Sequence, residues 1–289
     1  MATIWIDGEW HDRASAKVSV FDHGLLYGDG VFEGIRVYSG KVFRLQEHLE
    51  RLYDCAKAVD LVIPLAQDEF GRIIEEAVRR SGLQEAYIRP IVTRGVGDLG
   101  IDPRKCPAPT VIVIVDGISI WPAERYEQGL SVITAGTPIP HREALSPRVK
   151  SLNYLCHAMA KLEANNAGAD EALMMDSSGH IAEGTGQNLF VLKRQVLRTP
   201  PLSAGILAGV TRAAVIELAV AAGITVREEL LNRFDVYTAD EAFLTGTASE
   251  IAPIRSYDGR PIGSGRRGPV TKDLMARFRR LVSGSPPGS

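Results

Sequence analysis

Lys150 is the residue whose surroundings first suggest chemistry. It stands in the segment RVKSLNY at residues 148–154, just before a stretch expected to form a helix. Most lysines are solvated surface charges. A lysine that is partly desolvated beside another cation, here Arg148, is however well suited to form a Schiff base with a carbonyl compound. The local sequence permits this role and does not by itself decide between it and a surface charge.

Three later segments offer groups that a carbonyl cofactor with a phosphate would need. Glu183 is the one acid in the loop HIAEGTGQN at 180–188, and Val210 and Thr211 open an expected helix, whose N-terminus can bind phosphate. The segment TGTASE at 245–250 adds hydroxyls and backbone amides. Taken singly, a turn or an ordinary helix cap explains each. Together with Lys150, they supply the handles of pyridoxal 5′-phosphate: a lysine for its aldehyde, an acid for its pyridine nitrogen and donors for its phosphate.

Other motifs are weaker. The stretch GVGDLG at 95–100 fits G-x-G-x-x-G, but Pro103, Pro107 and Pro109 follow where a dinucleotide-binding helix would run, so a turn is favoured. The histidines show no metal-ligand spacing, and no G-x-S-x-G motif occurs. We therefore expect no metal site and no serine hydrolase.

Composition favours small-molecule chemistry. The 289 residues are 45% hydrophobic, enough for a sizeable core, and the formal net charge of −2 provides no general attraction to nucleic acid or to an anionic membrane. The 3 cysteines are widely spaced and form no CxxC, so a reducing compartment fits. No signal peptide or membrane span is recognisable. The sequence predicts a soluble, cytoplasmic protein.

The elements that would position these residues fall into two expected domains. Residues 3–43 contain short strand patterns, TIWID, KVSVF, VFEGIRVY and KVF, followed by two amphipathic helices within 44–60 and 70–78. The runs AYIRPIVTR and TVIVIVDG follow as strands, and the second is apolar enough to be central. This predicts an N-terminal domain over residues 1–118.

The second half repeats the mixture of strands and helices. An interdomain loop is expected at 119–128 and a C-terminal domain at 129–283, before a disordered tail at 284–289. One expected helix carries Leu152, Leu155, Met159 and Leu162 on one face, and another spans 209–222. The predicted fold class is α+β (mixed α/β) with two domains.

In this order of motifs the sequence resembles the class IV (fold type IV) pyridoxal-phosphate aminotransferases, and among them the branched-chain amino acid aminotransferases. The resemblance covers nearly the whole chain. It is carried by YGDGVFEGIR (27–36), HLERL (48–52), YIRP (87–90), RVKSLNY, IAEGTGQNLF (181–190), LAGVTR (207–212), LTGTASE (244–250) and GPVTK (268–272).

The resemblance implies roles for individual residues toward pyridoxal 5′-phosphate. Lys150 would be the catalytic Schiff-base lysine, Glu183 the partner of the pyridine nitrogen and Tyr154 the donor to the phenolic oxygen, while Leu207 would pack against the ring. The phosphate would be bound by Arg51, Val210, Thr211, Gly246 and Thr247. Without the resemblance, Arg51 reads as a solvated helix charge and Leu207 as core.

The resemblance also implies a substrate pocket. Thr247 and Ala248 would hold the substrate α-carboxylate. The side-chain pocket would be lined by Tyr27, Phe32, Gly34, Arg36, Tyr87 and Arg89, of which Phe32 and Tyr87 also fit ordinary strand interiors.

The expected activity is transamination of L-leucine, L-isoleucine or L-valine with 2-oxoglutarate in two alternating half-reactions. The alternatives are a D-amino acid or (R)-amine transaminase of the same fold, the more distant aminodeoxychorismate lyase, and a protein that binds the cofactor without turnover. Phe32, Gly34 and the GVG of 95–97 favour the branched-chain type.

Two further expectations come from the resemblance. Family members are dimers or larger, so a homodimer or higher homo-oligomer is expected. The interdomain loop around Trp121 and Tyr126 is shorter than in the better-known bacterial members, which leaves tolerance of aromatic or amine substrates open.

Overall fold

The computed structural model describes residues 2–284, whose contacts divide them into two compact units. Unit 1 comprises residues 2–118 and 149–153, and unit 2 comprises residues 119–148 and 154–284. The short segment around Lys150 thus packs with the N-terminal unit, although the chain on both sides of it belongs to unit 2. Of the tail expected at 284–289, residues 285–289 lie outside the described residues.

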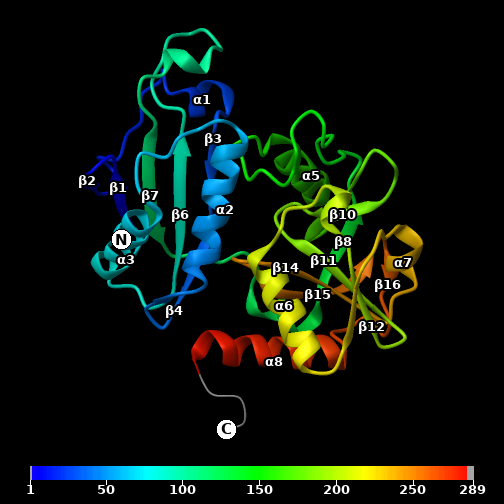
Figure 1. Cartoon of the computed structure of the whole chain (residues 1–289). Coiled ribbons are helices and arrows are strands. Elements are labelled where there is room, and N and C mark those ends of the chain that lie inside the picture. Colours follow the sequence, from blue (N-terminus) through cyan, green and yellow to red (C-terminus); the bar gives the residue numbers. More distant parts are fainter. Residues whose placement is uncertain (1, 285–289) are drawn as a thin grey trace. The chain divides into compact units, whose positions relative to one another are not determined.

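In the described residues, unit 1 contains a seven-stranded sheet in the order β2-β1-β7-β6-β4-β5, with β3 paired to β6 (Figure 1). Its strands are β1 (Thr3–Ile6), β2 (Glu9–His11), β3 (Gly30–Phe32), β4 (Ile35–Tyr38), β5 (Lys41–Val42), β6 (Ala86–Thr93) and β7 (Thr110–Asp116). The apolar strand β7 pairs antiparallel with β1 and β6. Its predicted central position is confirmed.

The strand predicted for KVSVF at 17–21 is wrong. These residues form no strand, and Val18, Val20 and Phe21 are exposed by 46%, 68% and 46%. Alternation produces a strand only where one face can be buried against a core, and here neither face is.

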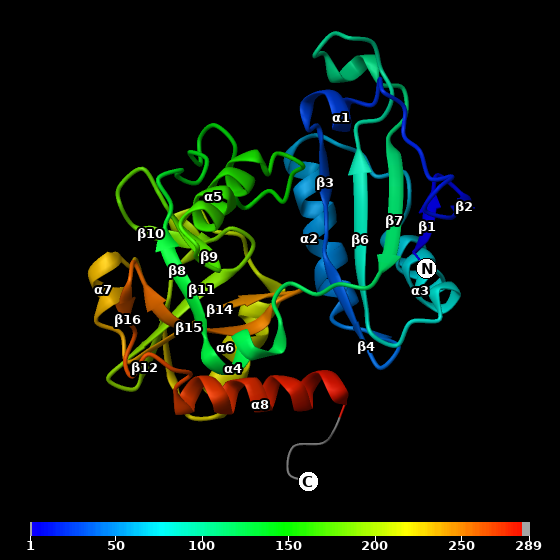
Figure 2. The ribbon, with the colours of Figure 1, turned by 180° about the vertical axis from the view of Figure 1, so that it is seen from behind.

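The helices of unit 1 are α1 (His23–Tyr27), α2 (Leu45–Ala58) and α3 (Gln67–Ser81), with the 3₁₀ helix η1 (Pro103–Lys105). Helix α2 buries Leu49 and Leu52, and α3 buries Phe70 and Ile74, in one core with the sheet. Helix α2 packs beside β3 and α3 beside β1 and β7, as the view from behind also shows (Figure 2). The two predicted amphipathic helices are confirmed.

In the described part of unit 2, nine strands form a mixed sheet in the order β10-β9-β8-β15-β14-β11-β12-β13, with β16 on β15 and an additional β10–β11 pairing. The strands are β8 (Leu130–Thr134), β9 (Glu171–Met175), β10 (Ile181–Gly184), β11 (Asn188–Lys193), β12 (Val196–Thr199), β13 (Thr225–Glu228), β14 (Glu241–Gly246), β15 (Glu250–Tyr257) and β16 (Arg260–Pro261). The helices are α4 (Ala123–Gln128), α5 (Leu155–Asn166), η2 (Leu202–Ala204), α6 (Val210–Ala221), α7 (Arg233–Tyr237) and α8 (Pro269–Ser283). None of the helices within residues 2–284 has the length and apolar character needed to cross a membrane.

Helix α5 buries a different face from the one predicted. Leu155, Met159 and Leu162 are exposed by 74%, 49% and 58%, whereas the buried residues are His157, Ala160 and Ala164. Small alanines let the helix approach strand β9 closely, so the apolar periodicity of the larger residues does not mark the core side.

The segment expected as an interdomain loop, 119–128, contains helix α4. Pro122 is its N-cap residue, and Trp121 is 9% exposed within the core of unit 2. The tryptophan ring also lies 5.9 Å from the Lys161 ammonium. This part of the chain is therefore packed onto unit 2.

Candidate active site

Lys150 is fixed in unit 1 through its backbone. Its N–H donates to the Cys55 Sγ at 3.3 Å, and its carbonyl accepts from the Phe32 N–H at 3.0 Å. The neighbouring Ser151 forms a bridge to Val31 of β3. The Lys150 Nζ lies 4.5 Å from the centroid of the Phe32 ring, within cation–π range. A lysine held in this way is not an ordinary solvated surface charge.

Arg51, expected at the phosphate, lies on α2 against a buried acid that the sequence did not reveal. Its Nε and Nη2 donate to the two carboxylate oxygens of Glu33 at 2.6 and 2.8 Å, and His48 Nδ1 lies 2.7 Å from Glu33 Oε2. Burial acts to raise the pKa of Glu33, but the Arg51 charge and the His48 hydrogen bond outweigh it and hold the pKa well below its ordinary value. Burial lowers the pKa of His48 despite the pull of Glu33, so the imidazole is neutral at pH 7. This cluster fixes the direction of the Arg51 side chain.

Four of the predicted pocket residues share one face of the unit 1 sheet or adjoin it. In β6, Ile88 points into the core, so Tyr87 and Arg89 point to the opposite face, and Arg36 of β4 is the register partner of Tyr87. The Arg89 guanidinium lies 4.7 Å from the Phe32 ring centroid and 5.4 Å from that of Tyr87.

The polar contacts of this face are local. Arg89 Nη2 donates to the Tyr87 hydroxyl at 3.1 Å, while the buried Arg89 Nε has no hydrogen-bond partner among the described residues. A Cβ on Gly34 would lie 1.9 Å from the Tyr87 hydroxyl oxygen, so a side chain at residue 34 would displace that ring. Arg36 lies 3.6 Å from a Glu85 carboxylate oxygen, and the Tyr27 hydroxyl donates to the Leu99 carbonyl at 2.5 Å.

Glu183 stands in β10 of unit 2, 5% exposed. Its Oε2 accepts from the Leu207 N–H at 3.0 Å and from the Asn188 side-chain amide at 3.2 Å. Its Oε1 lies 4.0 Å from His157 Nε2, beyond hydrogen-bonding distance. Both donors to Glu183 are neutral, so the carboxylate is oriented and its charge is left unpaired by them.

Tyr154 is linked to this acid through His157. Tyr154 is the N-cap residue of α5, and its ring stacks on that of His157 with centroids 4.3 Å apart and planes 18° apart. His157, which the sequence did not indicate, therefore lies next to the predicted site residues Tyr154 and Glu183, and the Leu207 N–H binds the same acid.

Asn188 of β11 connects Glu183 with the two segments of unit 2 that carry the expected phosphate donors. Asn188 pairs in register with Glu183 on one side and with Thr245 on the other. Helix α6 begins at Val210 after Gly209, with no side-chain cap, and a Cβ on Gly209 would lie 2.1 Å from Asn188 Oδ1. The start of α6 and the acid thus meet at Asn188.

The turn between β14 and β15 completes this part of the site. Gly246 ends β14, and Thr247 and Ala248 lie in the turn. The nearby hydroxyls of Thr245 and Ser249 are buried without a hydrogen-bond partner among the described residues. An unsatisfied buried hydroxyl is costly. Two of them beside a helix start are suited to an additional polar group.

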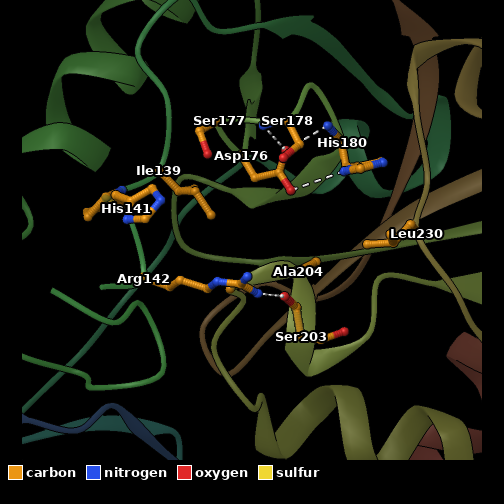
Figure 3. Close-up of a pocket in the computed structure, with 12 residues that line it drawn as sticks. Ile139, His141, Arg142, Asp176, Ser177, Ser178, His180, Ser203, Ala204 and Leu230 are labelled. Carbon is orange, nitrogen blue, oxygen red and sulfur yellow. Dashed lines mark hydrogen bonds and ion pairs between the residues drawn. The ribbon is translucent and has the colours of Figure 1, made fainter. Parts of the chain in front are cut away.

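A separate cavity of about 340 Å³ lies elsewhere in unit 2 (Figure 3). In it Asp176 accepts from the N–H groups of Ser178 and His180, and Arg142 Nη1 donates to the Ser203 carbonyl. None of the predicted site residues lines it. Its charged residues Asp176 and Arg142 are engaged in these contacts, and we assign it no chemistry.

Sequence reasoning missed Glu33, His48, Cys55, His157 and Asn188. Glu33, His48 and Asn188 stood inside recognised motifs, YGDGVFEGIR, HLERL and IAEGTGQNLF, where a polar residue was the available signal. The described residues contain no group of three or more His, Cys, Asp or Glu placed to hold a metal ion.

Comparisons with known proteins agree in one family. Residues 30–257 match the family described as Amino-transferase class IV. The branched-chain-amino-acid aminotransferase of Pseudomonas aeruginosa is 41% identical over 286 residues, 97% of this chain and 93% of that protein. The Escherichia coli branched-chain amino acid aminotransferase structure matches with a TM-score of 0.95, at 38% identity over 99% of this chain and 96% of that one. A T.th. enzyme of the same name, solved with pyridoxamine 5′-phosphate, matches with a TM-score of 0.94, at 38% identity over 99% and 95%.

Proposed function

The chain belongs to the class IV aminotransferase family, and from this we propose that it transfers amino groups between branched-chain L-amino acids and 2-oxoglutarate with pyridoxal 5′-phosphate as cofactor. The observation that carries the proposal is the set of groups around Glu183. An acid oriented by neutral donors stands beside an uncapped helix start and two buried, unsatisfied hydroxyls.

The residues of unit 2 fit the cofactor by chemistry. Glu183 keeps one oxygen, Oε1, that accepts no hydrogen bond from Leu207 or Asn188. A protonated pyridine nitrogen is a suitable donor for it. The hydroxyls of Thr245 and Ser249 lie beside the turn to which phosphate binding was assigned, and an added phosphate would bring acceptors close to them.

When bound, pyridoxal phosphate supplies an aldehyde that condenses with amines and a ring that takes up the electron pair released at the substrate Cα. We propose that Lys150 holds the cofactor covalently and, once freed, moves a proton from the substrate Cα with its Nζ. Glu183 holds the proton at the pyridine nitrogen. The Tyr154 hydroxyl donates a hydrogen bond to the phenolic oxygen.

The remaining cofactor residues bind and orient. Leu207 packs on the ring, and its N–H orients Glu183. Arg51, whose guanidinium is oriented by Glu33, is assigned to the phosphate as a further donor. Backbone and hydroxyl donors complete that phosphate site from Val210, Thr211, Gly246 and Thr247.

The substrate pocket must accept both a bare aliphatic side chain and the second carboxylate of 2-oxoglutarate. The rings of Phe32 and Tyr87 offer apolar surface, and the Arg89 guanidinium over both rings offers the charge. Gly34 leaves the space that Tyr87 occupies. We assign Tyr27 and Arg36 to the same pocket, and Thr247 with Ala248 to the substrate α-carboxylate.

The experiment that tests the proposal is covalent labelling. Apoprotein is mixed with pyridoxal phosphate and reduced with borohydride, and the peptides are analysed by mass. The adduct should lie on Lys150, and Lys150→Ala should lose both the adduct and transamination, while Lys57→Ala, an exposed lysine on α2, should keep both. An adduct on any other lysine of the unmodified protein would refute the assignment.

Substrate choice is tested with single half-reactions. L-leucine, D-alanine and 2-oxoglutarate are added separately, and the absorbance of the bound cofactor is followed. L-leucine should convert the pyridoxal form, and 2-oxoglutarate should restore it from the pyridoxamine form. Faster conversion by D-alanine would instead support a D-amino acid transaminase of the same fold.

We propose that the protein is a homodimer or a higher homo-oligomer. The face of α5 formed by Leu155, Met159 and Leu162 is exposed in the chain although apolar, and an uncovered apolar face of this kind suits an interface. Met159→Glu should lower the mass measured by light scattering, whereas Leu281→Glu, at an exposed leucine on α8, should not. A single-chain mass for the fully active unmodified protein would contradict the proposal.

Two assignments follow from the same reasoning. We propose a cytoplasmic location, supported by Cys55, Cys106 and Cys156, which are all free thiols. We also propose that unit 1 serves as the small N-terminal domain and unit 2 as the larger cofactor-binding domain of the family, with the segment 149–153 belonging to the first.

A further inference from the structure

His157 occupies an unusual place for a buried histidine. It lies in the first turn of α5, 7% exposed, three residues after Tyr154. Its ring stacks on the Tyr154 ring at 4.3 Å, and its Nε2 faces Glu183 Oε1 at 4.0 Å. Its Nδ1 lies 3.3 Å from Cys156 Sγ, its sequence neighbour. One imidazole therefore stacks on the residue assigned to the phenolic oxygen of the cofactor and faces the residue assigned to its pyridine nitrogen.

The contact with Tyr154 does something that the helix alone cannot. Tyr154 is the half-buried N-cap residue of α5. A near-parallel ring 4.3 Å away restrains its phenol, because rotating the phenol would break the face-to-face contact. The stacking thereby sets the direction of the Tyr154 hydroxyl.

We propose that His157 is a positioning residue: its ring holds the plane of Tyr154 so that the hydroxyl donates to the phenolic oxygen of the cofactor. The proposal rests on the proposed function, because it needs the cofactor on Lys150. It assigns His157 no contact with the cofactor or the substrate.

The role predicts a spectroscopic effect with a definite sign. A hydrogen bond from Tyr154 stabilises the negative charge of the phenolic oxygen. This stabilisation is largest when the Lys150 nitrogen carries no proton that could also bond to that oxygen, so the hydrogen bond favours the form in which the Lys150 nitrogen has lost its proton. Weakening this hydrogen bond raises the pH midpoint at which the absorbance of the bound cofactor changes. Simple loss of helix stability would lower the unfolding free energy without moving that midpoint.

The experiment is a double-mutant cycle on the cofactor-loaded protein, read by absorbance against pH. Tyr154→Phe should raise the midpoint by about 1 to 2 units and His157→Ala by about 0.5 to 1 unit. His157→Phe keeps a ring for stacking, so it should stay within about 0.3 unit of the unmodified protein. The double variant should match Tyr154→Phe alone, because His157 acts through Tyr154. If His157→Ala does not fold, His157→Gln, which has no ring, replaces it.

Two results would overturn the inference. One is a shift for His157→Ala that persists in the Tyr154→Phe background, and the other is a shift for His157→Phe as large as that for His157→Ala. Failure of the proposed function is recognised separately, because the unmodified protein would then carry no borohydride-fixed adduct on Lys150.

Discussion

Glu33 in unit 1 and Glu183 in unit 2 are both buried, but they are surrounded by different kinds of donor. Glu33 receives a two-point ion pair from Arg51 and a hydrogen bond from His48. Glu183 receives a backbone N–H and a side-chain amide on one oxygen, and its other oxygen lies 4.0 Å from the closest imidazole nitrogen, that of His157. The first carboxylate is paired within the protein, and the second is oriented without being neutralised.

This difference separates a structural role from a chemical one. An acid paired with a buried cation holds that cation in place, and removing either partner leaves an uncompensated charge. An acid held only by neutral donors can still pair with a charge brought by a ligand. Both glutamates are therefore important, but substitutions should affect different properties of the protein.

Of the residues compared here, Glu183 should have the largest effect on turnover. Glu183→Gln keeps the size of the side chain and an oxygen for the Leu207 N–H, but it cannot hold a proton at the pyridine nitrogen. Turnover should fall by about 10²–10⁴-fold, the range of a lost acid–base contribution. Steady-state kinetics with L-leucine and 2-oxoglutarate measure this loss.

The control for that variant is stability. Urea unfolding of Glu183→Gln should differ from the unmodified protein by less than about 1.5 kcal/mol, since the exchange removes no packing. Unfolding of the variant under assay conditions, or unchanged turnover, would show that Glu183 does not have the chemical role that distinguishes it from Glu33.

Glu33→Gln should act mainly on stability. It leaves the guanidinium of Arg51, 12% exposed, without its carboxylate. Loss of one partner of such a buried pair costs about 3–5 kcal/mol in unfolding free energy. Urea unfolding measures it, and Glu50→Gln, at an exposed acid on α2 next to Arg51, provides the control.

The same comparison has a pH dependence. The pKa of Glu33 is lowered in the folded protein, so its contribution to stability is fully present above the ordinary glutamate value and is lost as the pH falls through the folded value. The stability difference between the unmodified protein and Glu33→Gln should therefore shrink steadily below about pH 4.3. A difference that does not change with acid would exclude the ion pair as its source.

The contrast between these glutamates also marks how far the sequence could predict the site. Glu183 was recognisable because it is the one acid in a run of small residues before an apolar strand and because it stood in a motif of the resemblance, although the structure places it in β10 and not in the expected loop. Glu33 was not recognisable, since its partners Arg51 and His48 are distant in sequence and only the packing of α2 beside β3 brings them together. Contacts between separate elements leave no local pattern.

The fold shows the same division. Elements with a strong period and a core to cover, such as α2, α3 and β7, were predicted correctly. The errors arose where the apolar pattern was real but the surface stayed exposed, at residues 17–21 and on the Leu155 face of α5. Periodicity reports which residues share a face, and it does not report whether anything packs on that face.

Arg89 extends the comparison to cations and gives the smallest expected effect. The charge of Arg51 is met by Glu33, whereas Arg89 lies over the rings of Phe32 and Tyr87 and donates to a neutral hydroxyl. A carboxylate from 2-oxoglutarate would supply the missing partner, and a charge-assisted bond of this kind contributes about 1.5–3 kcal/mol.

Arg89→Gln should therefore raise the KM for 2-oxoglutarate by about one to two powers of ten, since each 1.4 kcal/mol corresponds to a factor of ten. The half-reaction with L-leucine should change much less, because its aliphatic side chain has no use for the guanidinium. For Arg89→Lys, which keeps the charge but not the planar group, the KM for 2-oxoglutarate should lie between those of the unmodified protein and Arg89→Gln. Equal losses in both half-reactions would instead mean that Arg89 only supports the Phe32 and Tyr87 rings, and its unmatched charge would then carry no information about the substrate.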